Sequence, residues 1–208
     1  TWLCANKLSL NIEKSKFVLF YPSQRNITQH FNLAIDDKII QQDNCIKYLE
    51  IFFIDSNLSW KSQVNYLAKK VKRSIGLLSK LRYYVNSTIL VNLYNTLIYP
   101  FLIYGIIAWG NIYPSTLQPL YVLQTKTVRM ITFSKFDEYS SPLFKQLGII
   151  KLFDLVTLSI SVFMYKFHNK LLPSTFNSFF TRVSKIHSYN TRAASKQSFY
   201  LPKARTNY

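Results

Sequence analysis

The side chains that could do chemistry in this chain are its histidines, cysteines and carboxylates, and their spacing completes no active site. His30, His168 and His187 have no second histidine or cysteine at metal-ligand spacing. Cys4 and Cys45 also lack metal-type spacing. They could form one disulfide, but we favour reduced thiols and an intracellular location, in the nucleus, the cytoplasm or both.

The carboxylates suggest no metal site either. Asp36 and Asp37 are the one adjacent pair, and they stand between two short β-forming runs, where Asp is common for turn reasons alone. No nucleophile elbow, phosphate-cradling glycine loop or Asp-x-Asp pair occurs. The sequence therefore predicts no self-contained catalyst, no metal ligands and no cofactor held by this chain.

The charge of the chain predicts a polyanionic partner. Of 208 residues, 26 are Lys or Arg and 9 are Asp or Glu, which gives a formal net charge of +17. No acidic residue lies between Asp55 and Asp137, and none follows Asp154. This excess of positive charge favours nucleic acid or an anionic membrane surface as the binding partner. The alternative is a basic surface that serves only solubility.

The elements that must position these cations change character along the chain. Short β-forming runs fill the first part and helical periodicity fills the rest, which predicts an α+β fold, mainly α, with a small antiparallel β region before a helical bundle. The expected strands are 16–21, a hairpin at 31–35 and 38–41, and 46–54. The expected helices are 60–85, 115–133, 142–147 with Gly148 as its C-cap, and 151–171.

One helix carries the strongest binding signal. Trp60–Val85 has apolar residues at helical spacing along one stripe and cations on the opposite side. The preceding residues Asp55, Ser56, Asn57 and Ser59 are candidate N-caps. We expect contact with nucleic-acid phosphates from Lys61, Lys69, Lys72, Arg73 and Lys80, the alternative being a solvated face.

The stretch Thr88–Trp109 is uncharged and mostly apolar, which raises the question of a membrane span. Asn92, Asn95, Thr96 and Pro100 interrupt it, so its longest clean run falls short of the roughly 20 residues that a spanning helix needs. We expect a helix at the centre of a bundle, apolar all round, and treat membrane association as the minor alternative.

Several stretches, in order, resemble one family. WLCANKLSLNIEKSKFVLF (2–20), IKYLEIFFIDSNLSWKSQV (46–64), LYNTLIYPFLIYGIIAWG (93–110), LQTKTVRMIT (123–132), PLFKQLGIIKLFDL (142–155) and the ending HSYNTR…RTN are similar to blocks of the reverse transcriptases of non-LTR, LINE-type retrotransposons. Each block alone is weak, but together they cover nearly the whole chain.

The resemblance implies RNA-templated DNA synthesis by two-metal phosphoryl transfer, with Mg²⁺ as the metal of a full-length enzyme. In this family the metal-binding aspartates precede the first matching block. The chain is therefore expected to be a fragment of an RNA-directed DNA polymerase that lacks the rest of the palm, the fingers and an endonuclease, and to incorporate no nucleotide alone. The implied partners are an RNA template and an RNA–DNA duplex.

The resemblance also implies site residues. Lys14 matches a lysine at the edge of the nucleotide site, where a cation could act as general acid toward pyrophosphate; a solvated turn lysine is the equal alternative. Tyr48, Leu49, Glu50 and Ile51 match the primer grip. The family has Gly where this chain has Glu50, so a grip weakened by bulk and negative charge is expected, and Glu50→Gly should strengthen primer-end binding.

The expected organisation is a palm remnant at 1–56, a helical thumb and connection at 57–183, and a basic, loop-like tail at 184–208. The tail carries Arg192, for which RNA or DNA contact is expected. A different class of function stays open: a non-catalytic nucleic-acid-binding helical module derived from such an element.

Overall fold

A computed structural model of the protein describes residues 5–21, 31–35, 38–49, 52–196 and 198–200. The chain divides into two compact units, Thr1–Val156 and Thr157–Tyr208. The division between them falls inside one helix, α8 (Leu152–His168). The boundaries at 56 and 183, which were drawn from element type and family resemblance, stay a prediction.

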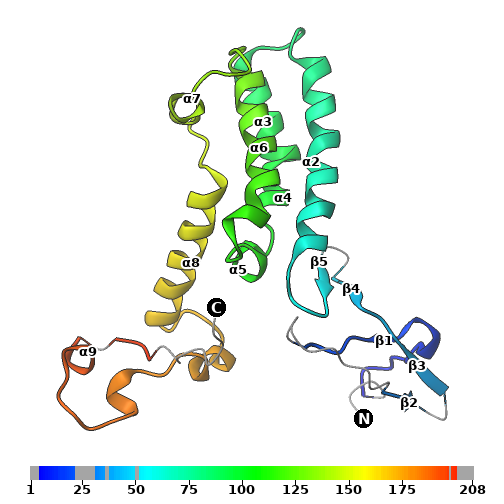
Figure 1. Ribbon diagram of the computed structural model, residues 1–208, viewed down its shortest axis with the longest axis vertical. Coiled ribbons are helices and arrows are strands. Elements are labelled where there is room, and N and C mark those ends of the chain that lie inside the picture. Colours follow the sequence, from blue (N-terminus) through cyan, green and yellow to red (C-terminus); the bar gives the residue numbers. More distant parts are fainter. Residues whose placement is uncertain (1–4, 22–30, 36–37, 50–51, 197, 201–208) are drawn as a thin grey trace. The chain divides into compact units, whose positions relative to one another are not determined.

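The first unit begins with a small β region (Figure 1). Its elements are η1 (Ile12–Lys14), β1 (Lys16–Phe17), β2 (Leu33–Ile35), β3 (Lys38–Gln42), β4 (Cys45–Tyr48) and β5 (Phe52–Asp55). β2 and β3 form the predicted antiparallel hairpin, with Ile35 opposite Lys38; Asp36 and Asp37 lie outside the described residues. β1 pairs in parallel with β3, a pairing that the sequence did not reveal. The α+β, mainly helical class is confirmed.

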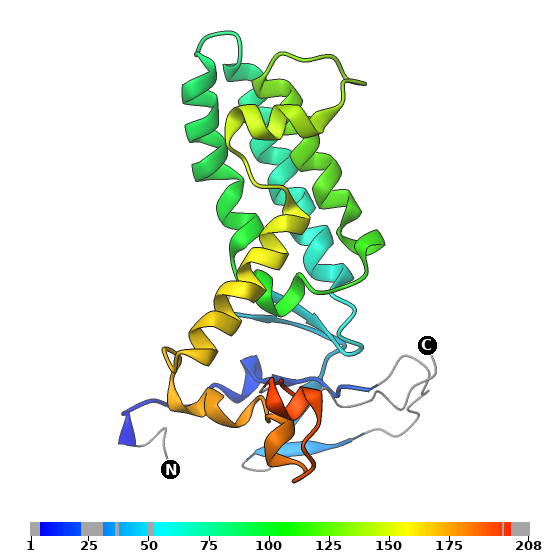
Figure 2. The same cartoon turned by 90° about the vertical axis from the view of Figure 1, so that its left-hand side faces the viewer.

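The expected single strand at 46–54 is wrong. Its two halves are separate antiparallel strands, β4 and β5, with Cys45 opposite Asp55 and Tyr48 opposite Phe52. Leu49, directly after β4, has a φ of 49°, a left-handed conformation that ends an extended strand. The hairpin strands lie at the end of the helical bundle in Figure 2. The stretch is therefore a hairpin that leads into the long basic helix.

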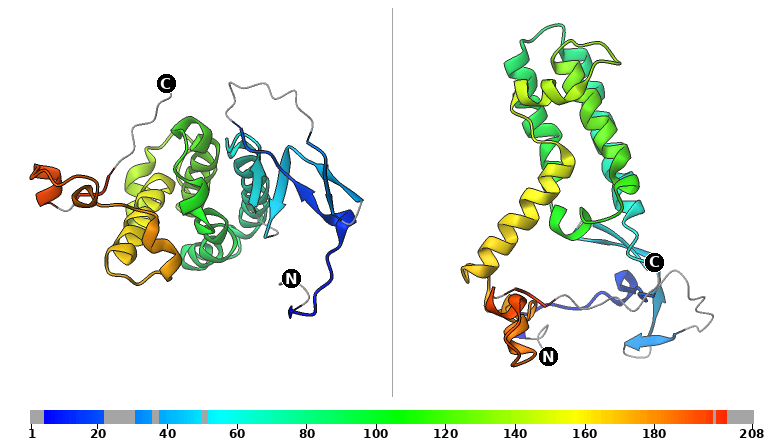
Figure 3. Two further views of the ribbon diagram at one scale, coloured as in Figure 1. Left: turned by 90° about the horizontal axis from the view of Figure 1, so that it is seen from below. Right: turned by 60° about the vertical axis from the view of Figure 1, so that its left-hand side comes forward.

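Seven helices of the described residues follow, counted as far as α8. They are α2 (Lys61–Leu81), α3 (Ser87–Leu97), α4 (Tyr99–Ile103), α5 (Ile106–Trp109), α6 (Pro114–Ile131), α7 (Ser140–Leu147) and α8. α2 packs against α6, α3 and α4, and α6 packs against α3 and α7. α2 and α6 run side by side in the same direction, as the views of Figure 3 also show. Gly148 ends α7 with a φ of 65°, which confirms it as the C-cap.

The core of the first unit is formed by apolar faces of these helices. α2 contributes a stripe with Val64, Leu67, Val71 and Leu78, each less than 3% exposed. Such a stripe at helical spacing is what the sequence predicted. The other large, fully buried side chains come from the helices around it: Leu90, Tyr94, Ile98, Leu102, Ile106, Trp109, Leu117, Leu120, Ile131 and Phe144.

The expected continuous central helix in Thr88–Trp109 is also wrong. The stretch forms α3, α4 and α5, because Pro100 begins a new helix and Gly105 takes a φ of 58°. Ile103, Tyr104 and Ile107 are exposed, so the stretch is not buried all round. No single helix among the described residues is long and apolar enough to cross a membrane; α7 and α8 pass that test only as a pair bent by 52°.

The second unit consists of α8 from Thr157 onward and a series of short elements. These are η2 (Ser174–Ser178), η3 (Val183–Lys185) and α9 (Arg192–Ser195). Arg182 and Phe199 form an isolated antiparallel bridge, and the Tyr200 N–H donates to the Thr181 carbonyl at 2.7 Å. Phenylalanine side chains hold the unit together, with the Phe167 and Phe180 ring centroids 4.9 Å apart.

Candidate nucleic-acid interface

The exposed side of α2 carries the cations that the sequence singled out. Lys61, Lys69, Lys72, Arg73 and Lys80 are all exposed, and none of them belongs to the buried stripe. Between Lys61 and Lys80 the helix rises about 28 Å at 1.5 Å per residue. Within the part of the chain that the structure describes, no carboxylate lies within ion-pair distance of these five side chains; the ion pair found there joins Lys16 and Asp43. Their charge is therefore available to an external anion.

A groove runs between α2 and α6 along one edge of this cationic side. Three cavities mark it, of about 310, 330 and 190 Å³. We call it the α2–α6 groove and define it by the residues that line these cavities: Lys61, Val64, Asn65, Lys72, Ile75, Gly76, Ser79 and Arg82 from α2 and its C-cap, and Ser115, Thr116, Pro119, Leu123, Lys126, Arg129, Met130, Ser134 and Phe136 from α6 and the residues after it.

The middle of the α2–α6 groove brings together cations from both helices. Lys72 and Lys126 line the same cavity, and Gly76 and Ser79 belong to the part of its wall that α2 forms. A Cβ added at Gly76 would meet no atom within 4 Å. Glycine inside a helix costs about 0.5–1 kcal/mol relative to alanine, so packing gives no reason for it here. The surface of α2 is therefore open at Gly76.

The far end of the groove is lined by two arginines whose guanidinium groups are held in place. The Arg129 guanidinium donates from Nε and Nη2 to the Glu138 carbonyl, at 2.9 and 2.7 Å. The Arg82 guanidinium lies 4.5 Å from the Phe133 ring centroid and 5.3 Å from that of Tyr83. Cations held by stacking and by neutral acceptors keep their full charge.

Buried polar contacts fix α6 against its neighbours. Gln124 is fully buried, and its Nε2 donates to the Tyr94 hydroxyl at 2.8 Å and to the Ile150 carbonyl at 2.9 Å. Its Oε1 accepts from the Leu152 N–H at 2.8 Å. Burial raises the pKa of Tyr94 to about 12, even though the hydrogen bond from Gln124 favours the phenolate. This network secures the helix that forms one wall of the groove.

The Asp55 carboxylate joins the β4–β5 hairpin to α2. Asp55, the last residue of β5, accepts from the Trp60 N–H at 3.2 Å and from the Ser59 hydroxyl. Of the four candidate N-caps, Ser59 is the one whose side chain bonds a backbone N–H at the start of α2: its Oγ accepts from the Lys61 N–H at 3.4 Å. Trp60 itself occupies the N-cap position, with a φ of 58°. Asp55 therefore positions the start of the basic helix.

The β region holds the remaining predicted site residues. Lys14 is exposed at the end of η1, and its N–H donates to Asn11 Oδ1 at 3.1 Å. Tyr48 and Leu49 are also exposed, at 55% and 62%; Glu50 and Ile51 lie outside the described residues, so the primer-grip assignment stays a prediction.

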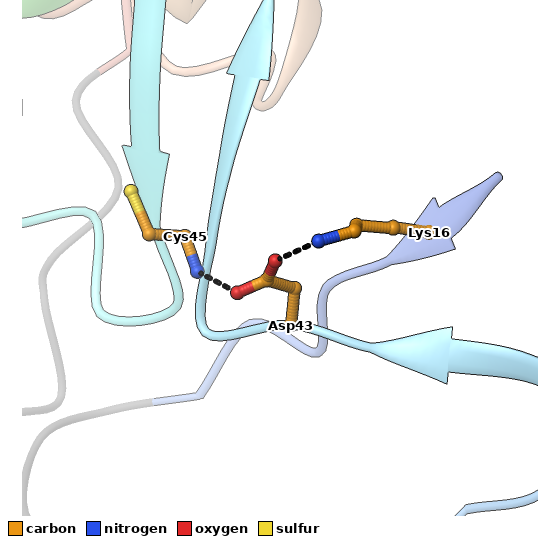
Figure 4. Close-up of polar contacts among 3 residues, drawn as sticks. All are labelled: Lys16, Asp43 and Cys45. Atoms are coloured by element: carbon orange, nitrogen blue, oxygen red, sulfur yellow. Dashed lines mark hydrogen bonds and ion pairs between the residues drawn. The ribbon is translucent and has the colours of Figure 1, made fainter. Parts of the chain in front are cut away.

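Asp43 ties the strand after Lys14 to the strand that ends at Tyr48 (Figure 4). The Lys16 ammonium lies 2.8 Å from Asp43 Oδ2, and the Cys45 N–H donates to Asp43 Oδ1 at 3.3 Å. The hydrogen bond from Lys16, with that from Cys45, lowers the pKa of the Asp43 carboxyl. Cys45 is a free, half-buried thiol, and Cys4 lies outside the described residues.

The structure thus brings together some of the predicted residues and adds others. Lys61 and Lys72 line the α2–α6 groove, whereas Lys69, Arg73 and Lys80 occupy the adjoining exposed side of α2. Arg192 is exposed at the start of α9, in the second unit. The contacts expected from the sequence did not include Lys126, and they missed Gly76, although a glycine inside a strong helical pattern was a signal.

No three His, Cys, Asp or Glu side chains come together as a metal site would require, as far as the described residues show. Comparison with models of protein families, with curated proteins and with solved structures finds no match to this chain.

Proposed function

We propose that this chain binds template–primer nucleic acid, as the thumb-containing C-terminal part of a non-LTR-type reverse transcriptase. The observation that carries the proposal is the α2–α6 groove, in which Lys61, Lys72 and Lys126 face an open channel without a described carboxylate partner. The family resemblance supplies the nature of the ligand, and the charge supplies its sign. The role assigned to the chain is binding, not catalysis.

The lining of the groove favours a duplex over a single strand. Apart from Phe136 at its far end, the described lining residues are aliphatic, polar or cationic. Proteins that hold single strands stack bases on aromatic side chains, whereas a duplex presents only phosphates and sugars to a groove of this kind. We therefore infer that an RNA–DNA duplex lies along α2, with Lys69, Arg73 and Lys80 as further phosphate contacts.

Binding to RNA–DNA hybrid duplexes over a series of salt concentrations tests the proposal. Affinity should fall steeply as salt rises, with a log–log slope of about −5 for six phosphate contacts, and two duplexes of different sequence should bind equally well. A slope near zero would exclude phosphate contacts as the source of binding.

Two variants that remove lysine charges inside and outside the groove test where the duplex binds. Lys72→Gln combined with Lys126→Gln should weaken the slope by about 2, since each phosphate contact contributes about one unit. Lys145→Gln is the control, because Lys145 is an exposed cation of α7 outside the groove. Equal effects of all three substitutions per charge removed would show that net charge alone drives binding and would contradict a site in the groove.

A further inference from the structure

The second unit contains a cavity that the proposed duplex contact does not use. It has a volume of about 460 Å³, within the range of about 300–1,000 Å³ that small-ligand sites occupy. Its walls come from the end of α8, the segment around η2, and the bridge between Arg182 and Phe199. A volume of this size accommodates one unpaired nucleotide.

Aromatic rings form one side of this cavity. Phe167, Phe180 and Phe199 all line it, and their ring centroids lie 4.9–5.9 Å apart in tilted and edge-on arrangements. All three side chains are partly exposed rather than fully buried. A pre-assembled aromatic wall of this kind offers a base a surface on which to stack.

Cations form the other side of the cavity. Lys170, Arg182 and Lys185 line it, together with His168, and the Arg182 guanidinium lies 5.9 Å from the Phe199 ring centroid. The sequence of Thr157–Tyr208 contains no Asp or Glu at all. The unit therefore offers Lys170 and Lys185 no side-chain carboxylate of its own, and an anionic ligand is their natural partner.

The backbone at Lys170 adds a separate observation. Lys170 has a φ of 55°, in the position after α8 where Gly or Asn would be less strained. Its N–H donates to the Phe167 carbonyl at 3.1 Å, which closes the end of the helix. Strain of this kind at a cavity is a reason to look for a function, because a lysine here places an ammonium at the cavity wall.

We propose that this cavity binds one unpaired nucleotide of a single-stranded nucleic acid, with the base against the phenylalanine wall and the phosphate between Lys170, Arg182 and Lys185. Asn177, Ser178 and Thr181 also line the cavity and offer hydrogen bonds to the base edge. The site lies in the other unit from the α2–α6 groove and does not depend on the proposed duplex contact.

Two probes of equal charge separate base stacking from charge attraction. The full chain is titrated with a short, labelled oligothymidylate and with an abasic phosphodiester of the same length, and binding is followed by fluorescence anisotropy. The wild-type chain should prefer the oligothymidylate by about tenfold, the value of one stacked base. Equal affinity for the two probes would overturn the proposal.

Variants then assign the site. Phe180→Leu should abolish the preference for bases, whereas Lys185→Gln should keep the preference and reduce the salt slope for both probes by about 0.7. Lys185 lies outside the phenylalanine cluster, so its variant remains informative if Phe180→Leu unfolds the unit. Lys196→Gln, an exposed cation of the same unit that does not line the cavity, should leave the slope unchanged. If Lys185→Gln and Lys196→Gln act alike, the cavity is not the site.

One variant distinguishes failure of the nucleotide site from failure of the duplex site. Lys72→Gln in the α2–α6 groove should weaken duplex binding and leave the preference for bases intact. Loss of that preference in Lys72→Gln would move the single-strand site to the groove and refute the cavity as its location.

Discussion

Gly76 offers the sharpest single test of the duplex contact, because alanine there should raise stability and lower affinity. The residue lies within α2, twenty-one residues long, and lines the same cavity as Lys72 and Lys126. The added methyl group would meet no atom within 4 Å of the Cβ position. The substitution should therefore stabilise the folded chain, because alanine favours a helix more than glycine does and no steric clash offsets that gain.

The expected magnitudes follow from that geometry. Alanine in a helix interior is more favourable than glycine by about 0.5–1 kcal/mol, which for a chain of this size corresponds to a rise in Tm of roughly 1–4 °C. A phosphate that approaches the Gly76 Cα closely would lose contact with the helix when a methyl group is inserted. We expect duplex affinity to fall about three- to tenfold, a cost of about 0.7–1.4 kcal/mol.

Thermal unfolding and duplex titration on the same preparation measure both effects. Ser79→Ala is a matched control, since Ser79 lines the same cavity one turn along α2 and its Oγ donates to the Gly76 carbonyl. A Gly76→Ala chain with higher Tm and unchanged duplex affinity would refute close approach of the nucleic acid to α2. A lower Tm would refute the open space itself.

Three further substitutions test the packing that supports the groove. Gly110→Ala should destabilise the first unit by about 1–3 kcal/mol, because its Cβ would lie 2.5 Å from the Ile106 carbonyl oxygen and 2.9 Å from Val156 Cγ2; a thermal midpoint equal to wild type would contradict this. Gln124→Met keeps the volume but removes three hydrogen bonds of a fully buried amide, so urea unfolding should show a loss of about 3 kcal/mol or more, and a loss below 1 kcal/mol would mean that the network contributes little. Tyr94 has a folded-state pKa of about 12 against an ordinary value of 10. Its contribution to the free energy of unfolding is therefore complete below pH 10 and is lost as pH rises from 10 through 12. That loss is on the order of 2 kcal/mol, and Tyr94→Phe should remove this part of the alkaline sensitivity, as urea midpoints at pH values on both sides of that window would reveal.

Local signals in the sequence predicted the elements whose geometry is set by neighbouring residues. The apolar stripe of α2 follows helical spacing, and Gly148 ends α7 because only a residue tolerant of positive φ suits that position. The β2–β3 hairpin was visible as two alternating runs.

The elements that were missed depend on contacts or conformations without a local signature. Leu49 turns the chain after β4 with a positive φ, although leucine is no turn residue, so the β4–β5 hairpin looked like one strand. Uniform apolarity across Thr88–Trp109 hid the breaks at Pro100 and Gly105. A hydropathy pattern records which residues avoid water, but not where a helix bends.

The candidate site was predicted in part for the same reason. The cations of α2 could be identified from one helix alone. The groove could not, because it exists only where Lys72 and Gly76 meet Lys126 across 50 or more residues of sequence. The cavity of the second unit likewise needs the tertiary arrangement of Phe167, Phe180 and Phe199.

The Gln124 contacts have a consequence for the order in which the protein can fold during its synthesis. The amide joins Tyr94, 30 residues earlier, to Ile150 and Leu152, 26 and 28 residues later. While a ribosome has released only α2 to α6, this amide has the tyrosine hydroxyl but not its two later backbone partners. The nascent helices should therefore stay open to chaperones and proteases until the start of α8 has emerged, and a stall in translation before Ile150 should leave a chain prone to aggregation.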